Sequence, residues 1–445
     1  MSNRMTKNPA TGKVLILAVL GLLATASTVG AVPQIMTEYG DIMGWRNADI
    51  NAMGGTGVAL YRGGMSNIYN PAMLATADGG RFDLSFSLEQ EHEDRFQPLF
   101  DSFDSWVTDA AIASNRDHYW QSGFALAGRP FGEETPVRAA ISLVDRYAFG
   151  YRFEEELRNP SPFPPGGGEP ARDAIIEERT RKVTGTLRNL SAGVGVDVDP
   201  KISVGATLNY AFGKRNEVNS VRDRIEADNS YNNEDELDIN GVNFILGARV
   251  VLTERVELGL AWESELSADG TLTQAHYNAA DGVTTDTSMD AYYRYPQIVR
   301  AGLTFRPQTD PRTVFTIEGE WTEWSELKDS QTAGDEFATP LENTMDVRIG
   351  LEHLFYNGMP LRFGFRHFDT YADRDAGSSV FSAGVGFNAM EGQISVSLEL
   401  GKITSIQPHQ FPYPDDYFGD SYVTDPEARV EDTRFRLGVG YTLDF

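Results

Sequence analysis

The sequence predicts an all-β protein: a transmembrane antiparallel β-barrel of about 14 strands. Three observations support this prediction. Beyond residue 80, apolar residues alternate with polar residues or glycine, as in strands that have one apolar face. The connections between these strands alternate between short turns and long polar segments, and the chain begins with an export signal.

The export signal is predicted for residues 1–31. Three basic residues, and no acidic residue, lie among the first 13 positions, and an apolar run extends from Val14 to Ala26. Small residues ending at Ala31 follow, which is the pattern of a cleaved secretory signal. The alternative is a membrane anchor, but a spanning helix needs ~20 apolar residues. Cleavage is expected after Ala31 or Ala26.

The alternation is clearest in the last twelve residues. Phe435, Leu437 and Val439 lie on one face of the expected strand, and Arg434 and Arg436 lie on the other. Similar patterns recur along the chain and give 14 strands. They fall near residues 82–88, 119–127, 137–153, 190–198, 202–210, 242–250, 256–262, 299–305, 315–321, 345–351, 361–365, 381–387, 394–400 and 435–445.

The connections indicate which end of each strand lies outside. Short turns are expected near residues 199–200, 253–254, 307–311, 357–358 and 390–392. Long acidic loops are expected over residues 91–118, 155–181, 214–238, 264–294, 325–342 and 404–431, with a short one at 371–377. Outer-membrane barrels have an even number of strands, short periplasmic turns and longer external loops. The start of the barrel is therefore placed in the periplasm.

The lumenal face must be the charged one, because Arg or Lys facing lipid at mid-membrane costs about 2–4 kcal/mol. The aromatic and aliphatic face therefore points outward, including Tyr147 to Phe153 in the third strand. Candidate lumenal charges are Arg138, Arg300, Glu318, Glu320, Arg348, Arg362 and Arg366, with Arg152 among further members of the set. These arginines could hold a substrate carboxylate, or could pair internally with the acidic residues and fix the barrel.

The third strand carries an irregularity. Asp145 falls on its apolar face, whereas the neighbouring Arg146 would face the lumen. A bulge or kink in the wall at Asp145 and Arg146 is therefore predicted.

Composition excludes several classes of function. The 38 Lys and Arg against 65 Asp and Glu give a net charge of −27, which argues against nucleic-acid binding. There is no cysteine, and no metal-binding or catalytic motif is present, so we expect no cofactor, no metal and no enzymatic activity. An acidic segment, Asp228–Asp238, could bind a divalent cation, but a solvated loop is the favoured interpretation. A barrel enzyme assembled from separate strands is kept as a third functional class.

In the segment before the barrel, residues 32–80, the part from residue 40 to 80 is rich in glycine and shows no sustained alternation. Its Gly54-Gly55-Thr56-Gly57 run lacks the spacing of phosphate-binding loops. The runs GGTGVAL and IYNPAML, followed later by YPQIVRAGLTFRP, TIEGEWTEWSELK and MDVRIGLEHLF, resemble the FadL/TodX family of outer-membrane transporters for hydrophobic compounds. PorV-like barrels of secretion machines share the first two runs, whereas the stretch from residue 295 to 327 favours the FadL side.

The resemblance implies a barrel over residues 81–445 that is plugged from within by residues 32–80. It implies passive uptake of hydrophobic molecules, such as long-chain fatty acids or hydrocarbons, with lateral release at a kinked third strand. Asn70-Pro71-Ala72 would shape the gate of the plug, or would be a turn that seats it. The alternative function is a non-transporting, secretion-associated scaffold barrel of the PorV kind.

The expected partners follow from this interpretation. They are a hydrophobic small molecule, outer-membrane lipid and the barrel-assembly machinery, for which the terminal Phe445 is a candidate contact. An interfacial aromatic is the simpler reading of Phe445. We expect a monomer in the outer membrane of a Gram-negative-type envelope.

Overall fold

The computed structural model describes residues 32–445 apart from positions 42–46, 101–102, 104, 133–134, 160–169, 333–339, 374, 412 and 414–426. The predicted export signal, residues 1–31, lies outside the described residues. Among the described helices, none has the length and apolar character needed to cross a membrane.

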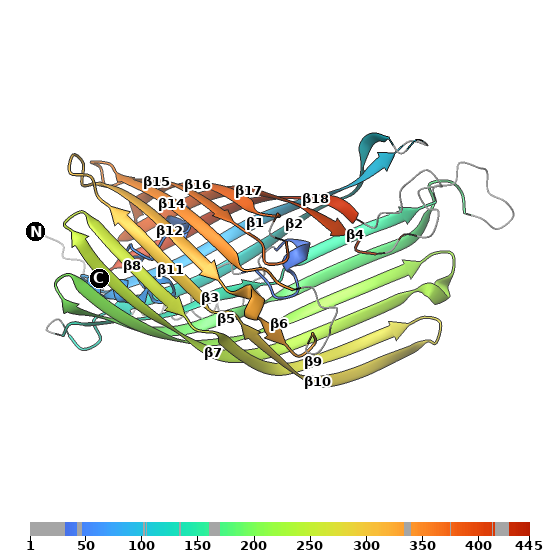
Figure 1. Cartoon of the computed structure of the whole chain (residues 1–445), viewed down its shortest axis with the longest axis horizontal. Coiled ribbons are helices and arrows are strands. Elements are labelled where there is room, and N and C mark those ends of the chain that lie inside the picture. Colours follow the sequence, from blue (N-terminus) through green and yellow to red (C-terminus); the bar gives the residue numbers. More distant parts are fainter. Residues whose placement is uncertain are drawn as a thin grey trace, which may run out of the picture.

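The strands form a single antiparallel sheet that closes on itself (Figure 1), because β1 pairs with both β2 and β18. Closure leaves the sheet without a free edge strand, as a lipid environment requires of a spanning sheet. The strands are β1 Arg81–Phe100, β2 Trp106–Gly128, β3 Val137–Ala148, β4 Tyr151–Arg158, β5 Ile175–Asp199, β6 Ile202–Asp223, β7 Tyr231–Thr253, β8 Val256–Glu263, β9 Leu266–Asn278, β10 Val283–Tyr295, β11 Ile298–Phe305, β12 Thr313–Thr322, β13 Lys328–Asp329, β14 Thr344–Leu354, β15 Pro360–Phe368, β16 Ser378–Ala389, β17 Gly392–Pro408 and β18 Glu427–Asp444.

Four of the wall strands are interrupted, so these elements make a barrel of 14 wall strands. The interrupted ones are β3 with β4, β8 with β9, β10 with β11, and β12 with β13. β3 and β4 both pair with β5, and β8 and β9 both pair with β7. The pieces β10 and β11 pair with β9 and β8, and β13 and β12 pair in turn with β10 and β11. The predicted all-β fold class and strand number are confirmed.

Three of the seven predicted external loops, 91–118, 214–238 and 264–294, are mostly strand. β5 has 25 residues and β7 has 23, far more than the ~9–11 needed to cross a bilayer. β9 and β10 occupy most of the predicted loop at 264–294. Outside the membrane both faces of a strand meet water, so pairing continues after the apolar alternation has disappeared. The sequence pattern therefore underestimated strand length at this end.

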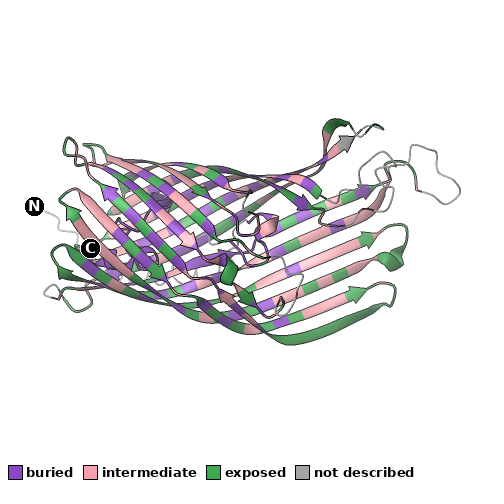
Figure 2. Cartoon of the chain, viewed as in Figure 1, coloured by how far each residue is buried: buried purple, intermediate pink, exposed green. Residues whose placement is uncertain are grey.

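The exterior of the wall is apolar, and its lumenal side is polar. Figure 2 shows exposed and buried residues alternating along the wall strands. In β18, Phe435 and Val439 are both 43% exposed, whereas Arg436 between them is only 8% exposed. Leu208, Leu246, Leu303 and other large apolar side chains are exposed in the same way on the remaining strands. An apolar exterior on a closed barrel is the architecture of an outer-membrane protein. The predicted membrane-spanning barrel and its outward face are confirmed here.

Short helices precede and follow some strands. Those before the barrel are η1 Gln34–Met36, α2 Ala48–Asn51, α3 Ser66–Tyr69 and η2 Pro71–Thr76, and the others are η3 Ala227–Asn229 and η4 Trp324–Glu326. Figure 1 shows the first helices in blue within the ring of strands. The C-terminal residue lies at the end of the barrel that carries the short turns, opposite the long β9–β10 hairpin.

Candidate functional site in the barrel lumen

Asn70 fixes the N-terminal segment to the inner wall. Its Nδ2 donates to the carbonyl oxygens of Val58, at 2.8 Å, and of Ala248 in β7, at 3.0 Å. Its Oδ1 accepts from the backbone N–H of Ala72 at 3.1 Å, so Asn70 also caps η2, in which Pro71 takes the first position. All three residues of Asn70-Pro71-Ala72 are buried. These contacts are those of a seated turn; a role in gating stays a prediction.

The wall has glycines where this turn touches it. A Cβ at Gly247 of β7 would lie 2.1 Å from Asn70 Oδ1, and a Cβ at Gly205 of β6 would lie 2.3 Å from the carbonyl carbon of Pro71. Real side chains do not approach so closely, so only glycine allows this docking. The glycine-rich lumenal face expected from the sequence thus has a packing cause.

Glu318 of β12 is bound by the glycine-rich run of the segment. Its carboxylate accepts backbone N–H groups of Gly57 at 2.9 and 3.0 Å, of Val58 at 2.7 Å and, more weakly, of Ala59 at 3.4 Å. Successive N–H groups that converge in this way form an anion-binding nest. The nest is filled by the Glu318 carboxylate of the same chain. The glycine-rich run therefore has a structural role that does not require a bound phosphate.

A second charge is held inside the segment. Asp49 of α2 lies 3.6 Å from Arg81 and 4.0 Å from Arg62. Burial raises the pKa of Asp49, but the charges of Arg362, Arg62 and Arg81 outweigh it and leave the pKa below its usual value.

Several predicted lumenal charges form one ion-pair chain across the lumen. Its members alternate in sign and are Arg146 of β3, Glu263 of β8, Arg300 of β11, Glu320 of β12, and Arg348 and Asp346 of β14. Arg146 meets Glu263 at 2.9 Å although β5, β6 and β7 separate their strands in the wall, so this contact bridges the lumen. We call this set the lumenal ion-pair chain.

Internal pairing accounts for these arginines. Within the lumenal ion-pair chain, Arg300 contacts Glu263 at 2.7 Å and also Glu320, and Arg348 contacts Glu320 at 2.7 Å. Arg300, Arg348 and Glu320 are each almost wholly buried. Charges paired in this way are satisfied by each other, which favours the structural interpretation over capture of a substrate carboxylate.

The remaining predicted charges lie elsewhere in the lumen. Arg362 pairs with Glu352 at 2.6 Å, and the guanidinium of Arg366 lies 4.6 Å from the ring centroid of Phe368. Arg138 donates to the carbonyl oxygens of Ala77, at the end of η2, and of Thr135. These three residues therefore do not join the lumenal ion-pair chain.

A buried apolar cluster fills the lumen on the outer side of this chain. On each strand that contributes to both, the charged residue lies nearer the short-turn end: Arg146 precedes Tyr147, Glu263 precedes Leu266, Glu320 precedes Trp324, and Arg300 follows Tyr295 toward that end. We call it the outer aromatic cluster, and its aromatic members are Tyr39, Tyr147, Phe149, Tyr151, Phe153, Tyr293, Tyr295, Trp324, Tyr371 and Phe411.

The start of the described chain lies within this cluster. Val32 and Met36 are buried there, and the Tyr371 hydroxyl donates to the carbonyl of Met36 at 2.7 Å. The Tyr39 hydroxyl donates to Asp329 at 3.0 Å. Sequence reasoning assigned none of these residues to a site. The alternation of Tyr293 and Tyr295 was a usable signal, but both fell at the edge of a presumed loop.

In the wall beside the cluster, the described backbone pairing between β2 and β3 stops before β3 ends. The described pairing of β2 with β3 covers only Phe124–Gly128 and Ala139–Leu143, whereas β3 continues along β5 to Ala148. The β3–β5 register shifts between Asp145 and Tyr147, which places a bulge at Arg146. The strand then breaks before β4. We call the region between β2 and residues 144–150 the wall seam.

Asp145 and Arg188 form an ion pair on the outer side of the seam. Their Oδ1 and Nε atoms are 3.0 Å apart, and the two residues are register partners. Arg188 shares its face of β5 with Leu190, which is 49% exposed, and alternates with the buried Leu187 and Asn189. The pair therefore lies on the outward face but is covered, with Asp145 only 1% exposed, and neutralisation of each charge by the other lowers its cost.

The N-terminal segment also pairs with the broken strand. Asp41 and Ala148 exchange two backbone hydrogen bonds, of 3.1 and 3.2 Å, and the Val32 N–H donates to Gly150 at 2.9 Å. The segment thus covers the inner side of the seam and supplies hydrogen-bond partners to the backbone of the broken strand.

The bulge reverses the faces of the strand that follows, and one prediction is therefore wrong. Tyr147, Tyr151 and Phe153 point into the outer aromatic cluster, although the alternation had placed them outward. Arg152, expected in the lumen, has a side chain that is 49% exposed and contacts Glu154. One extra residue at Arg146 shifts the period of two, so the phase read from Val137 no longer holds.

Comparison with known proteins agrees with this fold. The structure of a Pseudomonas aeruginosa FadL homologue superimposes with a TM-score of 0.64 at 14% identity, over 94% of this chain and 100% of that one. The P. putida toluene transporter TodX gives 0.60 at 15% identity, over 91% and 99%. The Ralstonia pickettii toluene transporter TbuX gives 0.56 at 13% identity, over 90% and 98%. The resemblance to FadL/TodX proteins is confirmed in the fold.

Sequence comparison adds one partial match. A family model described as BamG matches residues 169–321, about the span from β5 to β12. No curated protein matches the chain.

Proposed function

We propose that this protein is a non-catalytic outer-membrane channel for the passive uptake of hydrophobic molecules, which leave it sideways through the wall seam. One observation carries the proposal. An apolar lumenal cluster lies directly outside a charged layer, the lumenal ion-pair chain, and beside the wall seam.

The charged layer argues against a straight path to the periplasm. An apolar ligand that passed it would separate buried charges and leave them without partners, at a cost of several kcal/mol. The wall seam offers a different exit, because no described β2–β3 backbone pairing has to be broken there. The segment that covers it is held to the broken strand by three backbone hydrogen bonds of Asp41 and Val32, and Asp41 also lies 3.7 Å from Arg434.

The ligand class follows from the cluster and from the fold. Ten aromatic side chains, together with aliphatic ones, favour an apolar or weakly amphipathic ligand, such as a long-chain fatty acid or a hydrocarbon. Two of the structural neighbours are toluene transporters, and another is described as a monoaromatic hydrocarbon channel.

A deletion of the bulge residue tests this function. Removing Arg146 straightens β3, whereas Arg146→Met keeps the bulge and removes only the charge. In a strain that lacks the gene, we expect uptake of labelled oleate or toluene to be lost. The natural protein and the Arg146→Met variant should restore this uptake, whereas the variant without residue 146 should not. Normal uptake in the strain without the gene, or full rescue by the straightened strand, would refute the proposal.

The second candidate is a non-transporting scaffold barrel. The match of residues 169–321 to the BamG family model favours it, because that match is compatible with an association with the barrel-assembly machinery. In the same strains the abundance of other outer-membrane barrels separates the two functions. A scaffold predicts a general loss of those barrels, and a channel predicts loss of uptake alone.

A further inference from the structure

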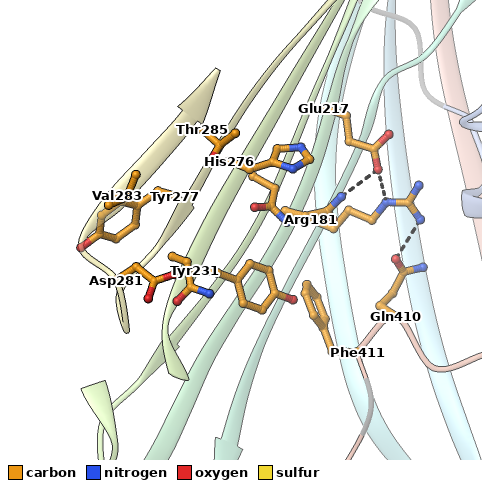
Figure 3. Close-up of a pocket in the computed structure, with 13 residues that line it drawn as sticks. Arg181, Glu217, Tyr231, His276, Tyr277, Asp281, Val283, Thr285, Gln410 and Phe411 are labelled. Carbon is orange, nitrogen blue, oxygen red and sulfur yellow. Dashed lines mark hydrogen bonds and ion pairs between the residues drawn. The ribbon is translucent and has the colours of Figure 1, made fainter. Parts of the chain in front are cut away.

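A polar cavity of about 1190 Å³ lies at the outer end of the barrel, beyond the outer aromatic cluster. Figure 3 shows the side chains that line it. One side is the inner face of the long strands β5, β6, β7, β9 and β10, and the other is formed by Gln410 and Phe411, which follow β17. The proposed uptake path does not account for it, because the cavity is lined mainly by polar side chains.

Five polar side chains form a row across this sheet. In register, Arg181 is opposite Asn219, Asn219 is opposite Asn233, Asn233 is opposite His276, and His276 is opposite Thr285. Directly opposed residues point to the same face of a sheet, and strands are ~4.8 Å apart, so the row is roughly 19 Å long. All five line the cavity.

The charges of this row are already neutralised. Arg181 contacts Glu217 at 2.9 Å, donates to Gln410 at 3.0 Å and to Thr37 at 3.2 Å. The Nε2 atom of His276 is 2.9 Å from the carboxylate of Asp235. Because the arginine is occupied and Asp281 adds a negative charge, the cavity does not favour an anion.

The neutral members of the row are available for hydrogen bonds. Within the described part of the chain, the side chains of Asn233 and Thr285 have no hydrogen-bond partner, whereas Asn219 donates to Glu217. An amide and a hydroxyl each donate and accept, which matches the hydrogen-bonding pattern of another hydroxyl group.

Two aromatic rings complete the site. Figure 3 shows the ring of Tyr231 directed toward that of Phe411 across the cavity. Phe411 belongs both to the cavity and to the outer aromatic cluster, so polar and apolar regions meet at this residue. Amphipathic rings provide rigid apolar surface beside polar contacts.

We propose that this cavity binds an uncharged, hydroxyl-rich ligand: a short neutral glycan, either free or as the head group of a glycolipid. The row of amide, imidazole and hydroxyl groups hydrogen-bonds successive hydroxyls, and the apolar face of a sugar ring packs on Tyr231 or Phe411. A glycolipid places its tail toward the outer aromatic cluster through Phe411. The binding goes beyond uptake and does not depend on it.

The test is calorimetric titration of the purified full-length protein in an amine-oxide detergent. The probes are maltotriose, for a free glycan, and hexyl maltoside, for a sugar head with an apolar tail; inorganic phosphate and spermine serve as charged comparisons. Asn233→Leu removes the centre of the row. Asn232→Leu is the matched control, because Asn232 lies one position earlier in β7 and is exposed on the opposite face.

We expect Asn233→Leu to weaken binding of a sugar probe about five- to tenfold, since it removes one or two neutral hydrogen bonds, and Asn232→Leu to leave it unchanged. Maltotriose binding identifies a free-glycan site, and binding of hexyl maltoside alone identifies a glycolipid head site. The proposal is overturned if neither sugar binds, if Asn233→Leu has no effect on their binding, or if phosphate or spermine is the probe whose binding depends on Asn233.

Discussion

Replacing Glu318 by alanine should release the glycine-rich run from the barrel wall. The variant removes the acceptor of the short hydrogen bonds from Gly57, at 2.9 Å, and Val58, at 2.7 Å, and leaves buried N–H groups without partners. Hydrogen bonds to a charged group contribute about 1.5–3 kcal/mol each, so the two together are worth about 3–6 kcal/mol. The 3.4 Å contact of Ala59 adds little.

Amide hydrogen exchange measures this loss directly. A local loss of about 3–6 kcal/mol corresponds to a roughly 10²- to 10⁴-fold fall in protection of the Gly57 and Val58 amides in the folded protein. Glu257→Ala is the control: it breaks a wall ion pair with Arg249 of 2.6 Å, and none of the described contacts of Glu257 is to the N-terminal segment. Unchanged protection of these amides in Glu318→Ala would show that the nest does not hold the segment.

Three further predictions concern stability, measured by the temperature at which the barrel loses its fast, folded mobility on electrophoresis. Gly247→Val should destabilise the barrel by at least about 1–3 kcal/mol and so lower that temperature, because its Cβ would lie 2.1 Å from Asn70 Oδ1. Gly282→Val is the control: Gly282 lies at a turn with positive φ and no neighbour within 4 Å, so this variant introduces backbone strain without a clash. Asp145→Ala should cost about 1.5–3 kcal/mol by removing the carboxylate that lies 3.0 Å from Arg188 Nε, and additional Arg188→Ala should restore most of it; no recovery would contradict the ion pair as the source of the loss. Glu263→Gln should cost about 3–5 kcal/mol by weakening two buried contacts of the lumenal ion-pair chain, and an effect below 1 kcal/mol would show that the chain is dispensable.

The fold could be predicted from the sequence because lipid imposes a period of two on each spanning strand. In β18 that period runs without interruption, and Phe435 and Arg436 lie on the faces that it predicts. The rule fails where its cause is absent. Beyond the membrane, the first eight residues of β10 pair with β9 although all eight are exposed, so no alternation of burial marks them as strand.

The site could be predicted only in part. The sequence indicated that Arg300, Glu320 and Arg348 share the lumen, but not that Arg146 crosses it to reach Glu263, because such a contact depends on the closure of the whole barrel. The irregularity at Asp145 was visible as a charge on an apolar face. Its consequence, the inward turn of Tyr147, Tyr151 and Phe153, requires knowledge of the bulge.

Because of the wall glycines, the N-terminal segment can be exchanged between barrels only together with the wall positions that contact it. Gly205, Gly247 and Gly364 stand where the chain of the segment would otherwise collide with a Cβ, so the inner wall is an imprint of one particular insert. A segment transplanted from another barrel would meet hollows shaped for a different backbone. Functional chimaeras should therefore require that these wall positions be transferred together with the segment, and homologous chains should vary at both places in concert.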